Sequence, residues 1–439
     1  MNLHPHQRRA IECGRAAVCR GARRFVFVAP TGAGKTIILS QIARGHLDAR
    51  AGNRVLILVH RRELVHQTVA KLGAMGVVDI DILAAGAEIA NGARVVVASV
   101  GTITARGELP PATLVLWDEC HHVVAKTFHD IYGGYPNAIH AGFTATPIRT
   151  DAKGLGAVFQ EMIEVSSVRE LTALGLLTPS EVFCLGEPTK DLAIDPVAAY
   201  QQYTPGRPAV VFAASVEHAR ALVPQFVAAG YQAACVDGEM PSAHRDAVLA
   251  RFAVGGLDVI TNCFVLTEGF DAPRAEVCVL ARSPNHVGTY LQMVGRVVRV
   301  AAGKKSATVL DLRGSALEHG LPDEDRRWSL DGEPCTRIET FTSVQRCSSC
   351  LALFRPAKKC PRCGAGHESI VKLPRALNRA EKLERLNDVP VAERDRRYVE
   401  RLLRIATTRM RMPAFRAKEW AHRRFRSQFG REPMIARAA

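Results

Sequence analysis

Long apolar runs are missing from this 439-residue sequence. Its longest ones, such as Val55 to Val59 and Val95 to Val100, have the length of a strand, whereas a membrane-spanning helix needs about 20 apolar residues. The N-terminus carries Arg8, Arg9 and Glu12 where a signal peptide would have its apolar stretch. We therefore expect a chain without a membrane anchor that works in the cytoplasm.

Aromatic residues are scarce, at 6%, although hydrophobic residues make up 47% of the sequence. This balance is typical of α/β proteins built from Val, Ile, Leu and Ala, and it argues against a secreted sandwich. Most of the twelve cysteines lack regular spacing, and in a cytosolic chain we expect them to be reduced. The length is sufficient for two hydrophobic cores and an appendage.

Short apolar runs alternate with helix-length segments in two series, which predicts two α/β lobes with parallel sheets. The first series comprises Phe25–Val28, Val55–Val59, Val95–Ala98, Leu114–Trp117 and His140–Phe143. The second comprises Val210–Ala213, Ala233–Val236, Val259–Thr261, Val277–Leu280 and Thr308–Leu310. Prolines are dense between the two series, which favours a linker there. The predicted divisions are lobe 1 over 1–168, linker over 169–208, lobe 2 over 209–325, cysteine module over 340–368 and tail over 369–439.

A phosphate-binding loop is predicted where Ala-Pro-Thr-Gly-Ala-Gly-Lys-Thr follows an apolar strand and opens a helical stretch. Backbone N–H groups of such a loop surround phosphates, and the helix N-terminus adds its positive dipole end. Lys35 would place its charge at the β and γ phosphates of ATP, and the Thr36 hydroxyl would reach Mg²⁺. The predicted nucleotide-binding residues of this loop are Pro30, Thr31, Gly32, Ala33, Gly34, Lys35 and Thr36.

Asp118 and Glu119 end another buried strand, at the edge where open α/β sheets bind their ligands. We expect Asp118 to hold Mg²⁺ through water and Glu119 to polarise the water that attacks ATP. An acidic pair by itself is more often a solvated loop or a helix cap. The phosphate-binding loop upstream is what favours the catalytic interpretation.

Four cysteines are regularly spaced. Cys347, Cys350, Cys360 and Cys363 form two C-x-x-C pairs separated by nine residues, the arrangement of a four-thiolate Zn²⁺ site. Four thiolates leave no open coordination position for water, so the metal would be structural. Reduced cysteines without metal are the alternative.

Positive charge gathers at the C-terminal end of the chain. The net charge is +15 overall, and residues 401–439 contain eleven Lys or Arg and only two acidic residues. Clustered cations suit the phosphate backbone of a nucleic acid. A solvated basic tail explains the same composition equally well.

The order of the motifs resembles that of superfamily 2 DExH helicases. Ala29–Thr36, Asp118–His121, Gly142–Pro147 and Gln292–Arg299 resemble motifs I, II, III and VI, and the likeness runs from Leu3 to about Asp311. Within the superfamily, the cysteine module after the second lobe resembles that of bacterial RadD-type DNA repair helicases, with phage UvsW-like and restriction-type translocases as cousins. The resemblance implies two tandem RecA-like lobes that share one ATP, then a zinc-ribbon-like module and a basic helical tail.

The resemblance also implies roles for residues around the ATP. Gln7 would read the adenine, while Gln292, Arg296 and Arg299 would act on ATP from the second lobe. These three share one helical face by their spacing, so the arginines could act together as arginine fingers. A surface stripe of ion pairs is the alternative for them.

Further implied roles concern lobe movement and nucleic acid. Gly269 and Asp271 would face the ATP cleft, and Thr144 and Thr146 would couple nucleotide state to lobe movement, unless their hydroxyls only satisfy a turn. The residues expected to contact nucleic acid are Arg61, Gln67, Ser99, Thr102 and Thr261. Serine and threonine are equally ordinary helix caps.

We therefore expect a monomeric ATP-dependent helicase or translocase, with repair or single-strand-binding proteins as partners. DNA is favoured as substrate because DEAD-box RNA helicases carry Asp-Glu-Ala-Asp and Ser-Ala-Thr, whereas this chain has Asp-Glu-Cys-His and Thr-Ala-Thr. The alternatives are an RNA helicase, or a zinc-bearing nucleic-acid clamp or switch with little motor work. Intact Glu119, Gln292, Arg296 and Arg299 argue against the clamp.

Overall fold

The computed structural model describes most of the chain up to residue 331 and shorter stretches beyond it. The described ranges are 3–60, 63–83, 92–107, 109–123, 125–149, 154–184, 192, 195–267, 272–284 and 286–331, with short pieces between 336 and 433. The chain forms two compact units, Met1–Leu373 and Pro374–Ala439. Within the described part, none of the helices combines the length and apolarity needed to cross a membrane.

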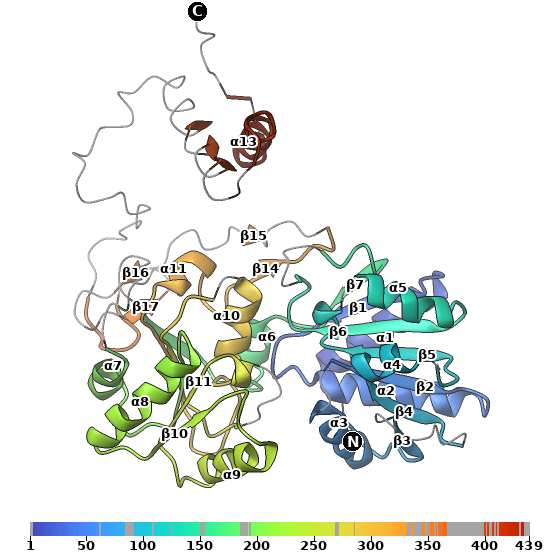
Figure 1. The fold of residues 1–439 in the computed structure, drawn as a ribbon, viewed down its shortest axis with the longest axis horizontal. Coiled ribbons are helices and arrows are strands. Elements are labelled where there is room, and N and C mark those ends of the chain that lie inside the picture. The colour runs from blue at the N-terminus through green and yellow to red at the C-terminus, as the bar shows by residue number, and fades with distance from the viewer. Residues whose placement is uncertain are drawn as a thin grey trace, which may run out of the picture. The chain divides into compact units, whose positions relative to one another are not determined.

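The first lobe contains a seven-stranded parallel sheet in the order β3-β4-β2-β5-β6-β1-β7 (Figure 1). Its strands are β1 Arg24–Val28, β2 Val55–Val59, β3 Ile80–Leu83, β4 Val95–Ser99, β5 Leu114–Asp118, β6 Ile139–Thr144 and β7 Glu161–Glu164. Its helices are α1 Pro5–Cys19, α2 Lys35–Ala49, α3 Glu63–Ala74, α4 Val100–Arg106, the 3₁₀ turn η1 Cys120–His122, α5 Ala125–Gly134 and α6 Val168–Ala173.

Both faces of this sheet are buried, which explains the continuous apolar runs in the sequence. Successive side chains of a strand point to opposite faces. In β2, Val55, Ile57 and Val59 enter the core formed with α1, α2 and α3, whereas Leu56 and Leu58 enter the core that contains Trp117 and helices α4 and α5. A polar residue at any of these positions would be buried on one face or the other.

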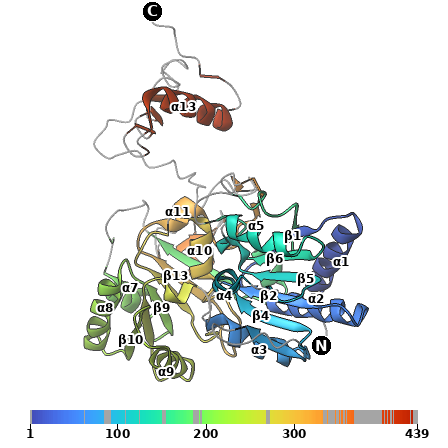
Figure 2. The ribbon, with the colours of Figure 1, turned by 45° about the vertical axis from the view of Figure 1, so that its right-hand side comes forward.

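The second lobe contains a sheet in the order β10-β11-β9-β12-β13-β8-β17-β16. Figure 2 labels β10, β9 and β13 of this sheet. Its strands are β8 Ser180–Cys184, β9 Ala209–Phe212, β10 Ala233–Val236, β11 Val259–Asn262, β12 Val277–Leu280, β13 Ala307–Asp311, β16 Gln345–Arg346 and β17 Ala352–Phe354. Its helices are α7 Pro196–Tyr203, α8 Val216–Ala228, α9 Ser242–Ala253, η2 Val265–Thr267, α10 Val287–Val294 and α11 Ser315–His319. The short strands β14 Arg326–Arg327 and β15 Thr336–Arg337 pair separately.

The prediction of two parallel α/β lobes is confirmed, and each predicted strand lies in one of the two sheets. Strands β3, β7 and β8 were not predicted, and β8 lies inside the expected linker. Because β8 pairs with β13 and α7 packs on the same lobe, residues 180–184 and 195–208 are part of the second lobe. The prolines permit this, since Pro179 precedes the strand and Pro196 occupies the first turn of α7.

The cysteine module extends the sheet of the second lobe. Strand β17 pairs antiparallel with β8, and β16 pairs with β17. Cys350 and Cys360 pack against the core of the lobe, and the Arg362 guanidinium lies 4.1 Å from the centre of the Phe183 ring. The described part of the module should therefore move with the second lobe.

Residues 319–330, which we name the strap, return from the second lobe to the first. The Arg326 guanidinium donates hydrogen bonds to the carbonyls of His319, Leu321 and Glu324, which fixes the bend of the strap. On the first lobe, the Leu330 carbonyl accepts a hydrogen bond from the Gly156 N–H at 2.7 Å. The strap is thus a second connection between the lobes, besides the linker.

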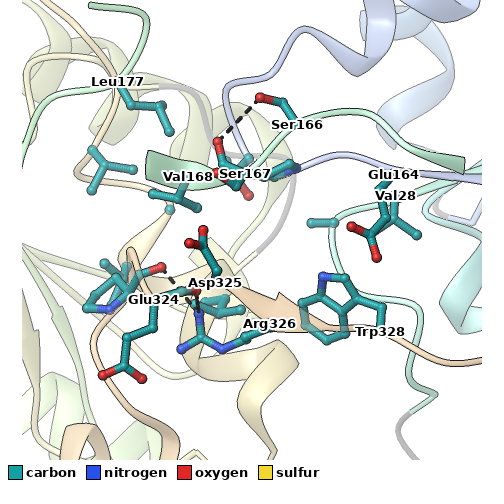
Figure 3. A pocket seen from close by; sticks show the side chains of 18 residues that line it. Val28, Glu164, Ser166, Ser167, Val168, Leu177, Glu324, Asp325, Arg326 and Trp328 are labelled. Atoms are coloured by element: carbon teal, nitrogen blue, oxygen red, sulfur yellow. Dashed lines mark hydrogen bonds between the residues drawn. The ribbon is translucent and has the colours of Figure 1, made fainter. Parts of the chain in front are cut away.

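A cavity of about 360 Å³ lies between the strap, the linker, α10 and the base of the phosphate-binding loop. Figure 3 shows Trp328 of the strap on the side of Val28 and Glu164, and Asp325 facing Ser167 and Val168. Burial raises the pKa of Glu164 above its usual value. The cavity walls come from both lobes, so its shape depends on how the lobes sit against each other.

The second compact unit contains helix α13, Ala414–Phe429. Ala417 and Ala421 are buried, and Ala421 packs with Val399 and Leu402. Arg416, Lys418, Arg423 and Arg424 are exposed on this helix. The basic tail is therefore helical over this stretch and presents cations to solvent.

Candidate nucleotide site between the two lobes

The phosphate-binding loop joins the end of β1 to the start of α2. Gly32 and Gly34 have φ values of 91° and 80°, in the left-handed region that favours glycine. The Ala33 N–H donates to the Pro30 carbonyl at 3.0 Å, which closes the loop, and Gly34 is the N-cap of α2. The unpaired N–H groups at the start of α2 can therefore serve an anionic ligand.

The Lys35 ammonium contacts Glu119 across the floor of the site. Its Nζ donates to Glu119 Oε1 at 2.6 Å, and both side chains are largely buried. Glu119 has φ 47°, a left-handed conformation that costs a non-glycine residue about 1 to 3 kcal/mol. Strained backbones of this kind are frequent at catalytic sites. A phosphate arriving at Lys35 would take over the ammonium and release the carboxylate.

Asp118 is positioned beside Glu119 at the carboxyl end of β5. Burial, together with the negative charge of Glu119, raises the pKa of Asp118 to about 6. Asp118 and Thr36 line the same pocket, and a carboxylate and a hydroxyl are the oxygen donors that Mg²⁺ prefers. The two residues therefore fit the predicted Mg²⁺ site, and a bound cation would favour the ionised carboxylate.

Both lobes line the nucleotide pocket, which has a volume of about 270 Å³. Lys35, Thr36 and Glu119 contribute from the first lobe, and Arg296 and Arg299 contribute from the second. An ATP bound at the phosphate-binding loop would therefore meet two guanidinium groups from across the cleft. This is the arrangement in which arginines stabilise charge on a transferring phosphoryl group.

Gln292 lies on the other side of motif II from this pocket. Its Nε2 is 3.1 Å from His121 Nε2, and His121 Nδ1 is 2.9 Å from the Thr144 hydroxyl. The Thr144 hydroxyl in turn accepts a hydrogen bond from the Thr146 N–H. Because Glu119 Oε2 lies 3.5 Å from His121 Nδ1, a continuous series of contacts joins the Glu119 carboxylate to the second lobe. The coupling role of Thr144 and Thr146 stays a prediction. These contacts give the path between Glu119 and the second lobe through which it would act.

Glycines allow the lobes to approach each other closely at two positions. A Cβ atom on Gly295 of the second lobe would lie 2.8 Å from Thr31 of the phosphate-binding loop. A Cβ on Gly288 would lie 2.9 Å from the Thr146 hydroxyl oxygen. Leu177 of the linker occupies the space that a side chain on Gly32 would need. A larger side chain at Gly295 or Gly288 would require Thr31 or Thr146 to shift.

Two donors hold the backbone of Arg299. Its carbonyl accepts hydrogen bonds from Lys304 Nζ at 2.7 Å and from the Thr178 hydroxyl at 3.2 Å. Lys304 Nζ also donates to the carbonyls of Ala275 and Pro273, at 2.6 and 3.1 Å. Burial lowers the pKa of Lys304 to about 8, so near pH 7 it keeps its proton and can supply all three donors.

Other residues predicted from the sequence have different surroundings. Gln7 bonds the Ala33 carbonyl through Nε2 and accepts the His4 N–H through Oε1, so it touches the phosphate-binding loop, and its adenine role stays a prediction. Gln67, predicted to contact nucleic acid, lines the nucleotide pocket. Lys71 lines it too and was missed, although its i, i+4 spacing from Gln67 places both on one helical face.

Three hydroxyls predicted to contact nucleic acid are buried. Ser99 accepts the Thr102 N–H as the cap of α4, and the two hydroxyls lie 2.8 Å apart. The Thr261 hydroxyl donates to the Ala219 carbonyl at 2.7 Å. The hydroxyls already have partners inside the protein, and their contact with nucleic acid stays a prediction. Arg61, Gly269, Asp271 and Cys347 lie outside the described residues.

The cysteine module brings three thiols together. Cys350 Sγ and Cys360 Sγ are 3.6 Å apart, and these two and Cys363 Sγ lie within 4.8 Å of one another. Tetrahedral zinc with Zn–S bonds of about 2.3 Å places its sulfur ligands roughly 3.8 Å apart. The three described thiols therefore fit one metal ion.

Two family models match the chain over both lobes. Residues 1–149 match the model described as type III restriction enzyme, res subunit, and residues 193–301 match the helicase conserved C-terminal domain. The chain belongs to the superfamily 2 helicases. With the nucleotide pocket between its lobes, it is an ATP-dependent helicase or translocase of that superfamily.

Two curated proteins illustrate the similarity. The helicase is 29% identical over 364 residues to the "51.5 kDa protein" of a Lactococcus phage, covering 76% of each chain. It is 25% identical over 364 residues to IRC3 of Saccharomyces cerevisiae, provisionally named an ATP-dependent helicase. That match covers 72% of this chain but only 52% of the yeast protein, so the helicase spans about half of that relative.

A solved structure shows the same fold. It is a fragment of a protein from Vibrio vulnificus YJ016, provisionally named the HsdR subunit of a type I restriction enzyme. The two share 24% identity with a TM-score of 0.57, over 75% of this chain and 66% of the other. At this identity the likeness concerns the fold alone.

Gly295→Ala should lower kcat for ATP hydrolysis at least about tenfold, because the added methyl group separates α10 from Thr31 and withdraws the arginines. Gly73→Ala is the matched control, since nothing lies within 4 Å of a Cβ at Gly73. Steady-state ATPase assays on both variants provide the measurement. Equal rates in the two variants would contradict the proposed closeness of the lobes.

Lys304→Met should lower kcat several-fold with little change in KM for ATP, because it removes the donors that hold the Arg299 backbone. The effect should be non-additive with Arg299→Ala, since both changes disable the same group. Lys305→Met, at the exposed neighbouring lysine, is the control and should match wild type. Additive losses in the double variant would instead indicate a purely structural role for Lys304.

Proposed function

We propose that this helicase uses ATP hydrolysis to move along or unwind DNA, in the cytoplasm, in repair or recombination, as a RadD-type enzyme. One observation carries the motor function. A single pocket is lined by Lys35 and Glu119 from one lobe and by Arg296 and Arg299 from the other. A nucleotide held at such a position links the two lobes, and its hydrolysis removes the link.

The contacts define how the pocket would act. ATP phosphates compete with Glu119 for Lys35, and the released carboxylate can then orient the attacking water. Mg²⁺, held by Thr36 and Asp118, would neutralise charge between the β and γ phosphates. The arginines stabilise charge on the γ-phosphate as long as α10 remains against the phosphate-binding loop. Loss of the γ-phosphate weakens this attraction, so the lobes can separate.

Two features support DNA as the substrate. The chain has Asp-Glu-Cys-His and Thr-Ala-Thr where DEAD-box RNA helicases usually have Asp-Glu-Ala-Asp and Ser-Ala-Thr. The match of residues 1–149 to the model described as type III restriction enzyme, res subunit, is consistent with a DNA substrate. The cysteine module after the second lobe supports the RadD-type assignment, and the exposed Arg416, Arg423 and Arg424 of the tail suit binding to nucleic-acid phosphates.

We also propose that the cysteine module holds one structural Zn²⁺, with Cys347 as its fourth ligand. The three described sulfurs already have suitable separations. Because β17 pairs with β8, the metal would secure the edge of the second lobe's sheet. Zinc would therefore act on stability, and through it on the position of the arginines.

ATP hydrolysis should rise at least about tenfold with single-stranded or forked DNA and less with RNA of the same sequence. Lys35→Ala and Glu119→Gln should abolish this turnover, because they remove the phosphate charge and the group that orients water. The measurement is an ATPase titration with single-stranded DNA, duplex, fork and RNA. Unchanged turnover in both variants would refute the site. Nucleic-acid binding without stimulated hydrolysis would favour the clamp, and stronger stimulation by RNA would favour an RNA helicase.

Purified protein should contain one zinc per chain by elemental analysis, and Cys360→Ser should lose it. The metal-free protein should unfold at a lower temperature, because the exposed edge of the second sheet loses its cover. Cys278→Ser, at a buried cysteine outside the module, controls for the loss of a thiol. Substoichiometric zinc in wild type, with no effect of Cys360→Ser on stability, would exclude the metal site.

A further inference from the structure

Phe264 is an exposed aromatic residue on a strained backbone. It is 46% exposed and has φ 64°, a region that large side chains seldom occupy. The turn that follows fixes this conformation, since the Thr267 N–H donates to the Phe264 carbonyl at 3.0 Å. This backbone conformation costs free energy, and it keeps an apolar ring near solvent. Packing within the lobe does not require the ring to be there.

One face of the Phe264 ring is covered by Arg282. The Arg282 guanidinium carbon lies 3.4 Å from the centre of the ring, and Nη1 donates to Cys263 Sγ at 3.6 Å. A cation over an aromatic face is attractive and fixes the tilt of the ring. Phe264 lines a neighbouring pocket of about 240 Å³, whereas Arg282 does not. The ring therefore contacts the cation and also lines the pocket.

The remaining walls of this pocket contain hydroxyl and cationic groups. Thr267, Thr289, Arg149 and His286 line it from both lobes. Thr267 is only 6% exposed, and among the described residues its hydroxyl has no hydrogen-bond partner. A buried hydroxyl without a partner is costly unless a ligand or water satisfies it. The pocket therefore offers a flat apolar face, an available hydroxyl and nearby positive charge.

We infer that Phe264, with Arg282 behind it, is a stacking platform for one nucleobase of the bound strand, and that the Thr267 hydroxyl meets the same nucleotide. Aromatic faces beside cations are how proteins hold single strands without reading their sequence. The inference rests on the proposed function, and it adds a residue outside the contacts predicted from the sequence.

The same pocket touches the path to the catalytic carboxylate. His121 and Gln292, which lie 3.1 Å apart, both line it. His121 is also the neighbour of Glu119. A base seated on Phe264 would therefore contact the residues that join the lobes, which gives a route from strand binding to ATP hydrolysis.

Phe264→Ala should weaken binding of a fluorescein-labelled single-stranded oligonucleotide at least about fivefold, measured by anisotropy without nucleotide, because one stacked base is lost. Phe264→Trp should bind like wild type, since it keeps an aromatic face. Val254→Ala, an exposed apolar side chain on the same lobe, is the control. Thermal unfolding of every variant shows whether the turn is intact.

A second arm places single abasic residues along the oligonucleotide. Wild type should bind more weakly with the gap at the stacked position, and Phe264→Ala should no longer respond to that gap. Equal affinities of wild type and Phe264→Ala, or equal sensitivity to the abasic residue, would overturn the platform. Measuring binding directly separates the platform from the motor function. Binding without stimulated ATP hydrolysis would refute the motor function. The platform would still be tested by comparing the affinities of wild type and the Phe264 variants.

Discussion

The contact of Gly295 with Thr31 is the constraint on which the catalytic arrangement depends. It places α10 directly on the phosphate-binding loop, and a single methyl group would not fit between them. Arg296 and Arg299 follow in the chain, so this contact also determines whether they line the nucleotide pocket. The distance from guanidinium to phosphate is therefore governed by backbone packing. A long flexible side chain is positioned more precisely when the backbone that carries it is rigid.

Several elements hold the backbone around Gly295 in place. The linker contributes Leu177 against Gly32 and Thr178 against the carbonyl of Arg299. Lys304 joins the same carbonyl to the carbonyls of Pro273 and Ala275. The strap connects the far side of the second lobe to the first. Since Leu177 and Thr178 contact Gly32 and Arg299 at the nucleotide pocket, a change of nucleotide should alter the contacts of the linker.

Motor function also requires that ATP is not hydrolysed before the nucleic-acid substrate is bound. In this structure Lys35 Nζ lies 2.6 Å from Glu119 Oε1, an ion pair that a bound phosphate would have to displace. His121 connects that carboxylate to Thr144 and Gln292, and the same residues border the pocket beside Phe264. The chemistry on one side of motif II and the proposed strand contact on the other are thus separated by only a few side chains.

The sequence by itself determined the features that are encoded by residues close together in the chain. Apolar runs buried on both faces identified the two parallel sheets, and the glycines of the phosphate-binding loop with Lys35 and Asp118–Glu119 identified the nucleotide chemistry. Tertiary structure alone decided the rest. It placed Gln67 and Lys71 in the nucleotide pocket, buried Ser99, Thr102 and Thr261, and joined β8 and the cysteine module to one sheet. These outcomes depend on which segments distant in the chain pack together. A local sequence pattern does not show which segments will lie beside it in the fold.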